Sequence, residues 1–140
     1  MVVRTIAELR SDMPVNVPGG ITASDMQNFI DSVEEFTTQR ISAKTASYTA
    51  VLADNRTFFT VSNASATTFT LPNSLPAGWE CAIKQIGAGQ VTVAVGSGGN
   101  LRHADNHTKT SKQWAVVYCK CYLNTGGTAA QISFTGDTVA

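Results

Sequence analysis

The sequence predicts a mainly β protein, in which an antiparallel β-sandwich or barrel-like domain of about seven strands follows a single helix. From Tyr48 onward, apolar and polar residues alternate with a period of two, and turn-forming residues separate the alternating runs. Before residue 37, apolar residues instead recur at the spacing of a helix. The change of period divides the chain into an N-terminal segment, residues 1–46, and a β domain, residues 47–140.

Seven runs of the β domain have the alternation and length of strands, and they cover residues 47–54, 56–63, 67–72, 79–87, 90–96, 113–123 and 129–136. The run 113–123 alternates most clearly. One face of this run consists of Val117, Cys119, Cys121 and Leu123. The other face carries Tyr118, Lys120 and Tyr122, which predicts a half-buried strand.

The predicted helix covers residues 23–36. Thr22 is a suitable N-cap, and Asp25 lies where a carboxylate complements the helix dipole. One apolar stripe follows helical spacing and consists of Met26, Phe29, Ile30 and Val33. The stripe packs either on the chain's own domain or against copies of the chain or a larger assembly. We predict the second role, attachment and oligomerisation.

The composition argues against several classes of protein. Only 14% of residues are charged and the net charge is zero, which argues against a general binder of nucleic acid or membrane surfaces. No apolar run is long enough to span a membrane, and no signal peptide is expected. The odd count of three cysteines favours free thiols in a reducing cytoplasm.

The stretch IGAGQVTVAVG, which begins at Ile86, has the glycines of a phosphate-binding loop but not their spacing. A dinucleotide-binding loop needs a third glycine and a helix after it. Here Val91, Val93 and Val95 alternate as in a strand. The sequence therefore predicts a hairpin turn at Gly87–Gly89 and no nucleotide cofactor.

The histidines and cysteines are the other residues that suggest chemistry. His103, Asp105 and His107 would point to one side of an extended segment and are types that ligate metals. We expect an exposed loop without metal; a metal shared at a threefold axis is the alternative. Cys81, Cys119 and Cys121 are expected to be buried thiols, because no fourth ligand is evident. No catalytic motif occurs, so we expect neither an enzyme nor a cofactor.

The two tryptophans, Trp79 and Trp114, are candidates for a surface that stacks on sugar rings. Tyr118 and Tyr122 could belong to the same surface. Packing in the core or in a subunit interface is the more common use of such residues and is the role we expect first.

Short motifs follow one another in a fixed order between residues 47 and 138: Thr70-Leu71-Pro72, Pro76-Ala77-Gly78, the run Gly87 to Val93, the run Lys109 to Ala115, and Gly136-Asp137. This order resembles the small β domains of tailed-bacteriophage fibre and decoration proteins. The segment GGITASDMQNFIDSV is also similar to the helix that precedes the β domain in many phage appendage proteins.

The resemblance implies a structural protein of the virion, assembled in the bacterial cytoplasm as a homotrimer. Its N-terminal segment would dock on phage capsid or tail proteins, and its β domain would project outward. The short N-terminal segment favours a head fibre or capsid decoration protein, because a fibre that reaches a receptor needs a shaft. The alternatives are a tail-fibre receptor-binding tip, which contacts host surface glycans, and a free carbohydrate-binding module.

Overall fold

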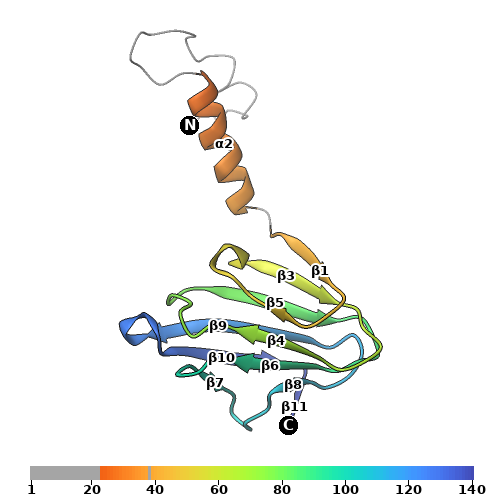
Figure 1. The fold of residues 1–140 in the computed structure, drawn as a ribbon. Coiled ribbons are helices and arrows are strands. Elements are labelled where there is room, and N and C mark those ends of the chain that lie inside the picture. The colour runs from red at the N-terminus through yellow and green to blue at the C-terminus, as the bar shows by residue number, and fades with distance from the viewer. Residues whose placement is uncertain (1–22, 38) are drawn as a thin grey trace, which may run out of the picture. The chain divides into compact units, whose positions relative to one another are not determined.

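The computed structural model describes residues 23–37 and 39–140 and divides the chain into two compact units, Met1–Gln39 and Arg40–Ala140 (Figure 1). The Thr22 cap and the part of the attachment segment before residue 23 lie outside the described residues. Residues 41–44, which the change of period places in the N-terminal segment, instead form the first strand of the second unit.

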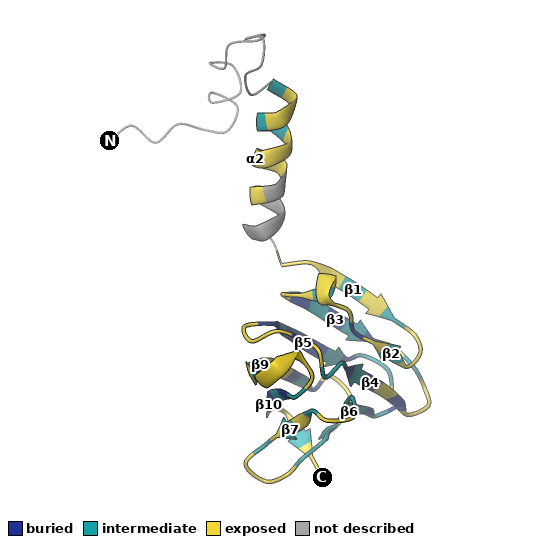
Figure 2. Cartoon of the chain, turned by 60° about the vertical axis from the view of Figure 1, so that its left-hand side comes forward, coloured by how far each residue is buried: buried dark blue, intermediate teal, exposed yellow. Residues whose placement is uncertain are grey.

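The first unit contains the helix α2, Ala23–Thr37, which confirms the predicted helix. Asp25 lies in its first turn. On the predicted apolar stripe, Phe29 is 64% exposed and Val33 is 44% exposed. Met26 and Ile30 are half-buried. Figure 2 shows that exposed and intermediate residues alternate along the described part of α2. Large apolar side chains of this helix therefore face solvent in a single chain.

The second unit is a β-sandwich of two sheets, so the mainly β prediction is confirmed (Figure 1). The six-stranded sheet has the order β1 (Ile41–Lys44), β3 (Thr57–Val61), β5 (Glu80–Gln85), β9 (Val116–Asn124), β10 (Ala130–Gly136) and β7 (Asn100–Arg102). The five-stranded sheet has the order β11 (Thr138–Val139), β8 (Lys109–Thr110), β6 (Val91–Val95), β4 (Thr67–Leu71) and β2 (Tyr48–Thr49). Two short 3₁₀ helices, η1 (Leu52–Asp54) and η2 (Thr125–Gly127), complete the unit.

The strands pair in a mixed pattern, so the expectation of antiparallel pairing throughout is wrong. In the six-stranded sheet β1, β3 and β5 run parallel, and in the five-stranded sheet β2, β4 and β6 run parallel. β7 is also parallel to β10, whereas β9 is antiparallel to both β5 and β10. The cause is the path of the chain. From β1 to β6 successive strands alternate between the two sheets. Every second strand therefore lies in the same sheet and runs in the same direction, which makes its pairing with the previous strand of that sheet parallel.

The connections 45–47, 62–66 and 86–90 each pass from one sheet to the other, and we call them the three arches. They stack on one another, because Asn63 Nδ2 donates to Thr45 O at 2.6 Å and Gly89 N donates to Asn63 O at 2.8 Å. The segment Gly87–Gly89 therefore belongs to an arch, and the prediction of a hairpin turn there is wrong. The arch 62–66 joins β3 to β4. These two strands pair with β5 and β6 at the same offset of 24 residues, Thr57 with Cys81 and Thr67 with Val91.

The seven predicted runs correspond to β2, β3, β4, β5, β6, β9 and β10, and β9 extends one residue beyond its run. The short strands β1, β7, β8 and β11 were not expected. In the run 47–54 only Tyr48–Thr49 is a strand. The Asp54 carboxylate explains the difference, because it accepts hydrogen bonds from Tyr48 Oη at 2.8 Å and from Val51 N at 2.9 Å. These bonds close the chain into η1.

The alternation predicted for β9 is confirmed over most of its length. Val117, Cys119 and Cys121 are buried, and the tyrosines and lysine of the other face are exposed. Leu123 was expected on the buried face but is exposed. The register with β10 shifts between Gln131 and Ile132, and this bulge ends the regular alternation before Leu123.

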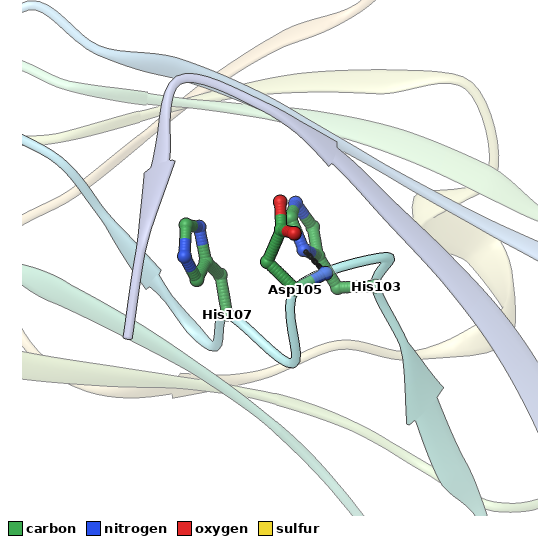
Figure 3. Close-up of side chains that lie close together, drawn as sticks. All are labelled: His103, Asp105 and His107. Atoms are coloured by element: carbon green, nitrogen blue, oxygen red, sulfur yellow. Dashed lines mark hydrogen bonds between the residues drawn. The ribbon is translucent and has the colours of Figure 1, made fainter.

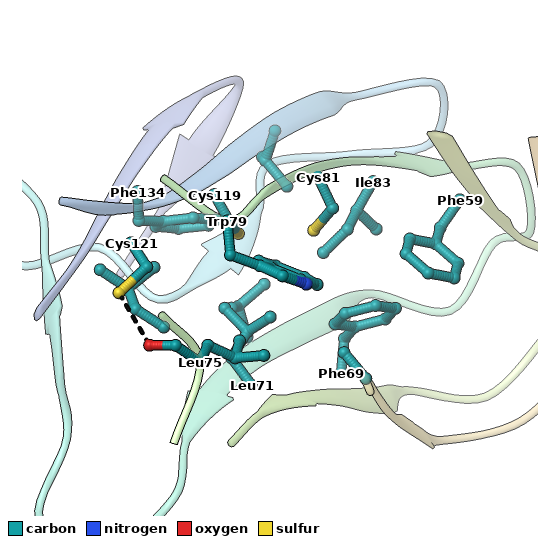
Figure 4. Close-up of a cluster of buried hydrophobic side chains, with 14 of the residues drawn as sticks. Phe59, Phe69, Leu71, Leu75, Trp79, Cys81, Ile83, Cys119, Cys121 and Phe134 are labelled. Atoms are coloured by element: carbon teal, nitrogen blue, oxygen red, sulfur yellow. Dashed lines mark hydrogen bonds between the residues drawn. The ribbon is translucent and has the colours of Figure 1, made fainter. Parts of the chain in front are cut away.

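Large side chains from both sheets fill the core (Figure 4). Phe59 of β3 and Phe69 of β4 meet edge to face, with ring centroids 4.8 Å apart. Trp79 is 1% exposed, and its Nε1 donates to Leu52 O at 3.2 Å, so its one polar atom is satisfied. Complete burial of such a side chain stabilises the fold by about 2–3 kcal/mol.

Candidate functional site

The loop between β7 and β8, residues 103–108, contains both histidines of the chain, and we call it the histidine loop. The loop brings His103, Asp105 and His107 together, with one ligand atom of each within 4.8 Å of the others (Figure 3). The two imidazole rings stack with centroids 4.7 Å apart and planes inclined by 15°. The three residues therefore lie together, but a turn closed by Asn106 N and His103 O brings them together rather than the extended segment that was expected.

Thr138 of β11 bonds to both histidines and was not anticipated from the sequence. Its Oγ1 lies 2.9 Å from His103 Nε2 and 3.0 Å from His107 Nδ1. The backbone N–H of Asp105 donates to His103 Nδ1 at 3.0 Å, so in neutral His103 the proton is on Nε2. His103 Nε2–H then donates to Thr138 Oγ1, which also shares a hydrogen bond with His107 Nδ1. One hydroxyl thus orients both rings.

Surrounding contacts hold the histidine loop in place. Asn106 has a positive φ of 58°, and its N–H donates to His103 O at 3.2 Å, which closes the turn. The His103 ring also packs near Phe134, at 5.9 Å between centroids. The histidines are half-buried and the Asp105 side chain is exposed, so the site is open to solvent on its carboxylate side.

A buried polar contact anchors β8, the strand that follows the histidine loop. Thr110 Oγ1 accepts a hydrogen bond from Val91 N at 3.0 Å and donates to Gln85 Oε1. Gln85 and Thr110 are both buried. The contact joins β8 to β6 of its own sheet and to β5 of the opposite sheet.

The two tryptophans lie in different environments. Trp79 belongs to the core, which is the role expected first, and its possible part in a ligand surface is wrong. Trp114 is 59% exposed, and Lys84 Nζ lies 5.8 Å from the centroid of its ring. Its backbone is in the left-handed region, with φ of 72°, and its N–H donates to Gln85 O at 2.8 Å. Such a conformation is uncommon for a bulky residue.

A row of apolar side chains crosses the outer face of the six-stranded sheet. Ile41, Phe58, Ala82 and Tyr118 occupy one register across β1, β3, β5 and β9. Ile41 and Tyr118 are exposed, Phe58 is half-buried, and Ala82 is buried between its larger neighbours. Sequence reasoning placed Tyr118 on the exposed face of its strand, but it missed Ile41 and Phe58 because their register depends on parallel pairing.

The three cysteines are free and buried, as expected. Cys81 lies opposite Cys119 across β5 and β9. A hydrogen bond to Cys119, together with burial, raises the pKa of the Cys81 thiol. Burial also raises the pKa of Cys121, whose Sγ donates to Leu75 O at 3.3 Å. The raised pKa values keep the Cys81 and Cys121 thiols protonated, and all three cysteine side chains pack in the core as small apolar groups.

No family model, curated protein or solved structure matches the chain. In the part of the chain that the structure describes, no helix is both long and apolar enough to cross a membrane.

Proposed function

We propose that this chain is a structural protein of a bacteriophage virion, a homotrimeric surface appendage of the head-fibre or capsid-decoration type. Two lines support the proposal: the resemblance of the motifs in residues 47–138 to phage appendage domains, and the exposed apolar stripe of α2. The single observation that carries it is the exposure of Phe29 and Val33 in an isolated chain.

The stripe of α2 needs a partner for two physical reasons. A helix of 15 residues is marginally stable by itself in water, so most of its stability must come from packing. Burial of Phe29 and Val33 in an interface would stabilise the assembly by about 2 kcal/mol for each side chain. The spacing of Met26, Phe29, Ile30 and Val33 also matches the seam of a helical bundle. Three copies of the helix, related by a threefold axis, would cover one another's stripes.

The β unit is suited to project from a particle, because it has a core of its own. Every member of its main hydrophobic cluster lies between residues 50 and 134. Loss of helix packing would therefore leave this core intact. In the proposed arrangement the N-terminal segment contacts capsid or tail proteins, and the β unit faces outward.

Location on the particle tests the proposal. Purified virions are labelled with a gold-conjugated antibody against the β unit and imaged by electron microscopy. We expect label on the head surface of particles that carry the natural chain and strong loss of label with Phe29→Ala or Ile30→Ala. Ser24→Ala, on the opposite side of the helix, is the matched control and should label normally. Absence of label from intact virions, or normal label with Phe29→Ala, would contradict the proposal.

The exposed Trp114 favours a second candidate function, glycan binding by a tail-fibre tip or a carbohydrate-binding module. Its indole offers an apolar face for a sugar ring, and the neighbouring Lys84 offers hydrogen-bond donors. Titration with host surface glycans, followed by tryptophan fluorescence, tests this candidate. It requires a signal that disappears in Trp114→Ala and persists in Tyr122→Ala, a control at another exposed aromatic residue.

A further inference from the structure

We propose that the histidine loop binds one divalent transition-metal cation of the Zn²⁺ type per chain, through His103, Asp105 and His107. The inference goes beyond the proposed function and does not depend on it, because all three ligands come from one chain. It replaces the expectation of a loop without metal and the alternative of a metal shared at a threefold axis.

The residue types suit this class of cation. Two imidazoles and one carboxylate are ligands that Zn²⁺ and its first-row neighbours accept, whereas Ca²⁺ and Mg²⁺ prefer oxygen ligands throughout. Bonds of about 2.0–2.1 Å in a tetrahedral site separate the ligand atoms by about 3.4 Å. The three ligand atoms here lie within 4.8 Å of one another, so small side-chain rotations would bring them into place.

The site is largely organised before any cation arrives. The stacked rings of His103 and His107 are oriented by the hydroxyl of Thr138. The Phe134 ring packs near the ring of His103. A fixed arrangement lowers the entropy lost on binding. The Asp105 carboxylate is exposed, so water can reach the cation and complete its coordination.

The hydrogen bonds around the rings define what a cation must displace. His103 Nδ1 accepts from the backbone N–H of Asp105, and His107 Nδ1 shares a hydrogen bond with the hydroxyl of Thr138. A neutral imidazole has one ring nitrogen with a free lone pair, so coordination either replaces these hydrogen bonds or moves the ring proton to the other nitrogen. Each of these two contacts is one hydrogen bond with a neutral group, and coordination to a divalent cation can replace it.

The test is calorimetric titration of the full chain, prepared without a histidine tag, with ZnCl₂. We expect one Zn²⁺ per chain. Titration with Co²⁺ in place of Zn²⁺ then reports on the ligands, because thiolate ligation produces intense near-ultraviolet charge-transfer bands that nitrogen and oxygen ligands do not. We expect visible cobalt bands without the thiolate bands.

Variants separate the proposed site from other binding. Asp105→Asn removes the carboxylate charge and keeps the backbone N–H that bonds to His103; we expect it to weaken Zn²⁺ binding at least tenfold. His107→Ala should weaken it further, and thermal unfolding of each variant checks that the β unit remains folded. Glu80→Gln, which alters an exposed carboxylate bonded to Lys120, is the control and should bind as the natural chain does. Four results would overturn the proposal: no binding, thiolate bands, one cation per three chains, or undiminished binding by Asp105→Asn and His107→Ala.

Discussion

Gly87 packs directly against the backbone of Asn63 in the neighbouring arch. A Cβ atom at Gly87 would lie 2.1 Å from Asn63 O, and a Cβ at Gly89 would lie 2.0 Å from Ser65 O. Both contacts are with backbone atoms, which cannot rotate away as a side chain can. The glycines that look like a phosphate loop in the sequence therefore allow two arches to stack closely.

Gly87→Ala and Gly89→Ala should each destabilise the β unit. Because the added methyl group meets backbone, the arches must separate, and we expect the free energy of unfolding to fall by about 3 kcal/mol or more. Urea unfolding followed by the fluorescence of the buried Trp79 measures the change. Gly126→Asn is the control, since Gly126 has φ of 69° and a Cβ atom there would have no other atom within 4 Å; we expect a loss of less than about 1 kcal/mol. If Gly126→Asn lowered the free energy of unfolding as much as Gly87→Ala and Gly89→Ala do, close stacking of the arches would not be the cause.

The period-two alternation predicted the long strands but not how they pair. A strand alternates in the same way whether its neighbour is parallel or antiparallel, and glycine is used both in hairpin turns and in arches. Only the path of the chain between sheets distinguishes the two. The strands β8 and β11 have two residues each, which is too short for any alternation to be visible.

Thr110→Val should destabilise the contact between β8 and the rest of the sandwich. The substitution keeps the shape of the side chain but leaves Val91 N–H and Gln85 Oε1 buried without a partner. We expect a loss of about 2 kcal/mol in the free energy of unfolding, measured by urea denaturation. The exposed Thr68 on β4 gives the matched control: Thr68→Val should stay within about 0.5 kcal/mol of the natural chain. A Thr110→Val protein as stable as this control would contradict the assigned role.

The buried thiols should make the fold sensitive to alkali. The pKa of Cys81 is raised above its ordinary value of 9.0 in the folded chain. Its stabilising contribution is therefore complete below about pH 9 and is lost as pH rises further, by about 1.4 kcal/mol per pH unit. Urea unfolding between about pH 8 and pH 10 should show this fall, and Cys81→Ala should make the slope shallower. An unchanged slope in the variant would contradict the assignment to Cys81.

The hydrogen bond from Asp105 N predicts the tautomer of His103. The neutral ring should carry its proton on Nε2, because its Nδ1 accepts that bond. The ¹⁵N chemical shifts of the rings measure this directly. Thr138→Val should remove the hydrogen bond to His107 and leave the bond from Asp105 N to His103, and with it the His103 tautomer, in place. A His103 ring protonated on Nδ1 in the natural chain would contradict the arrangement.

His103, Asp105 and His107 could be predicted from the sequence as one group of candidate metal ligands, because they are neighbours in the chain. Thr138 lies 35 residues from His103, and nothing in its surroundings indicates a contact with the histidine loop. The pairing of β11 with β8 creates that contact, and neither strand was expected. The sequence also could not distinguish the buried Trp79 from the exposed Trp114, because burial depends on which distant segment covers each ring.

In the proposed assembly, α2 joins three chains through its apolar stripe. Size-exclusion chromatography with light scattering measures the mass of the full chain in solution most directly. We expect three times the mass of one chain, a shift toward the monomer for Phe29→Ala, and no shift for Ser24→Ala. A natural chain that elutes as a monomer at high concentration, or a Phe29→Ala variant that remains a trimer, would contradict the claim.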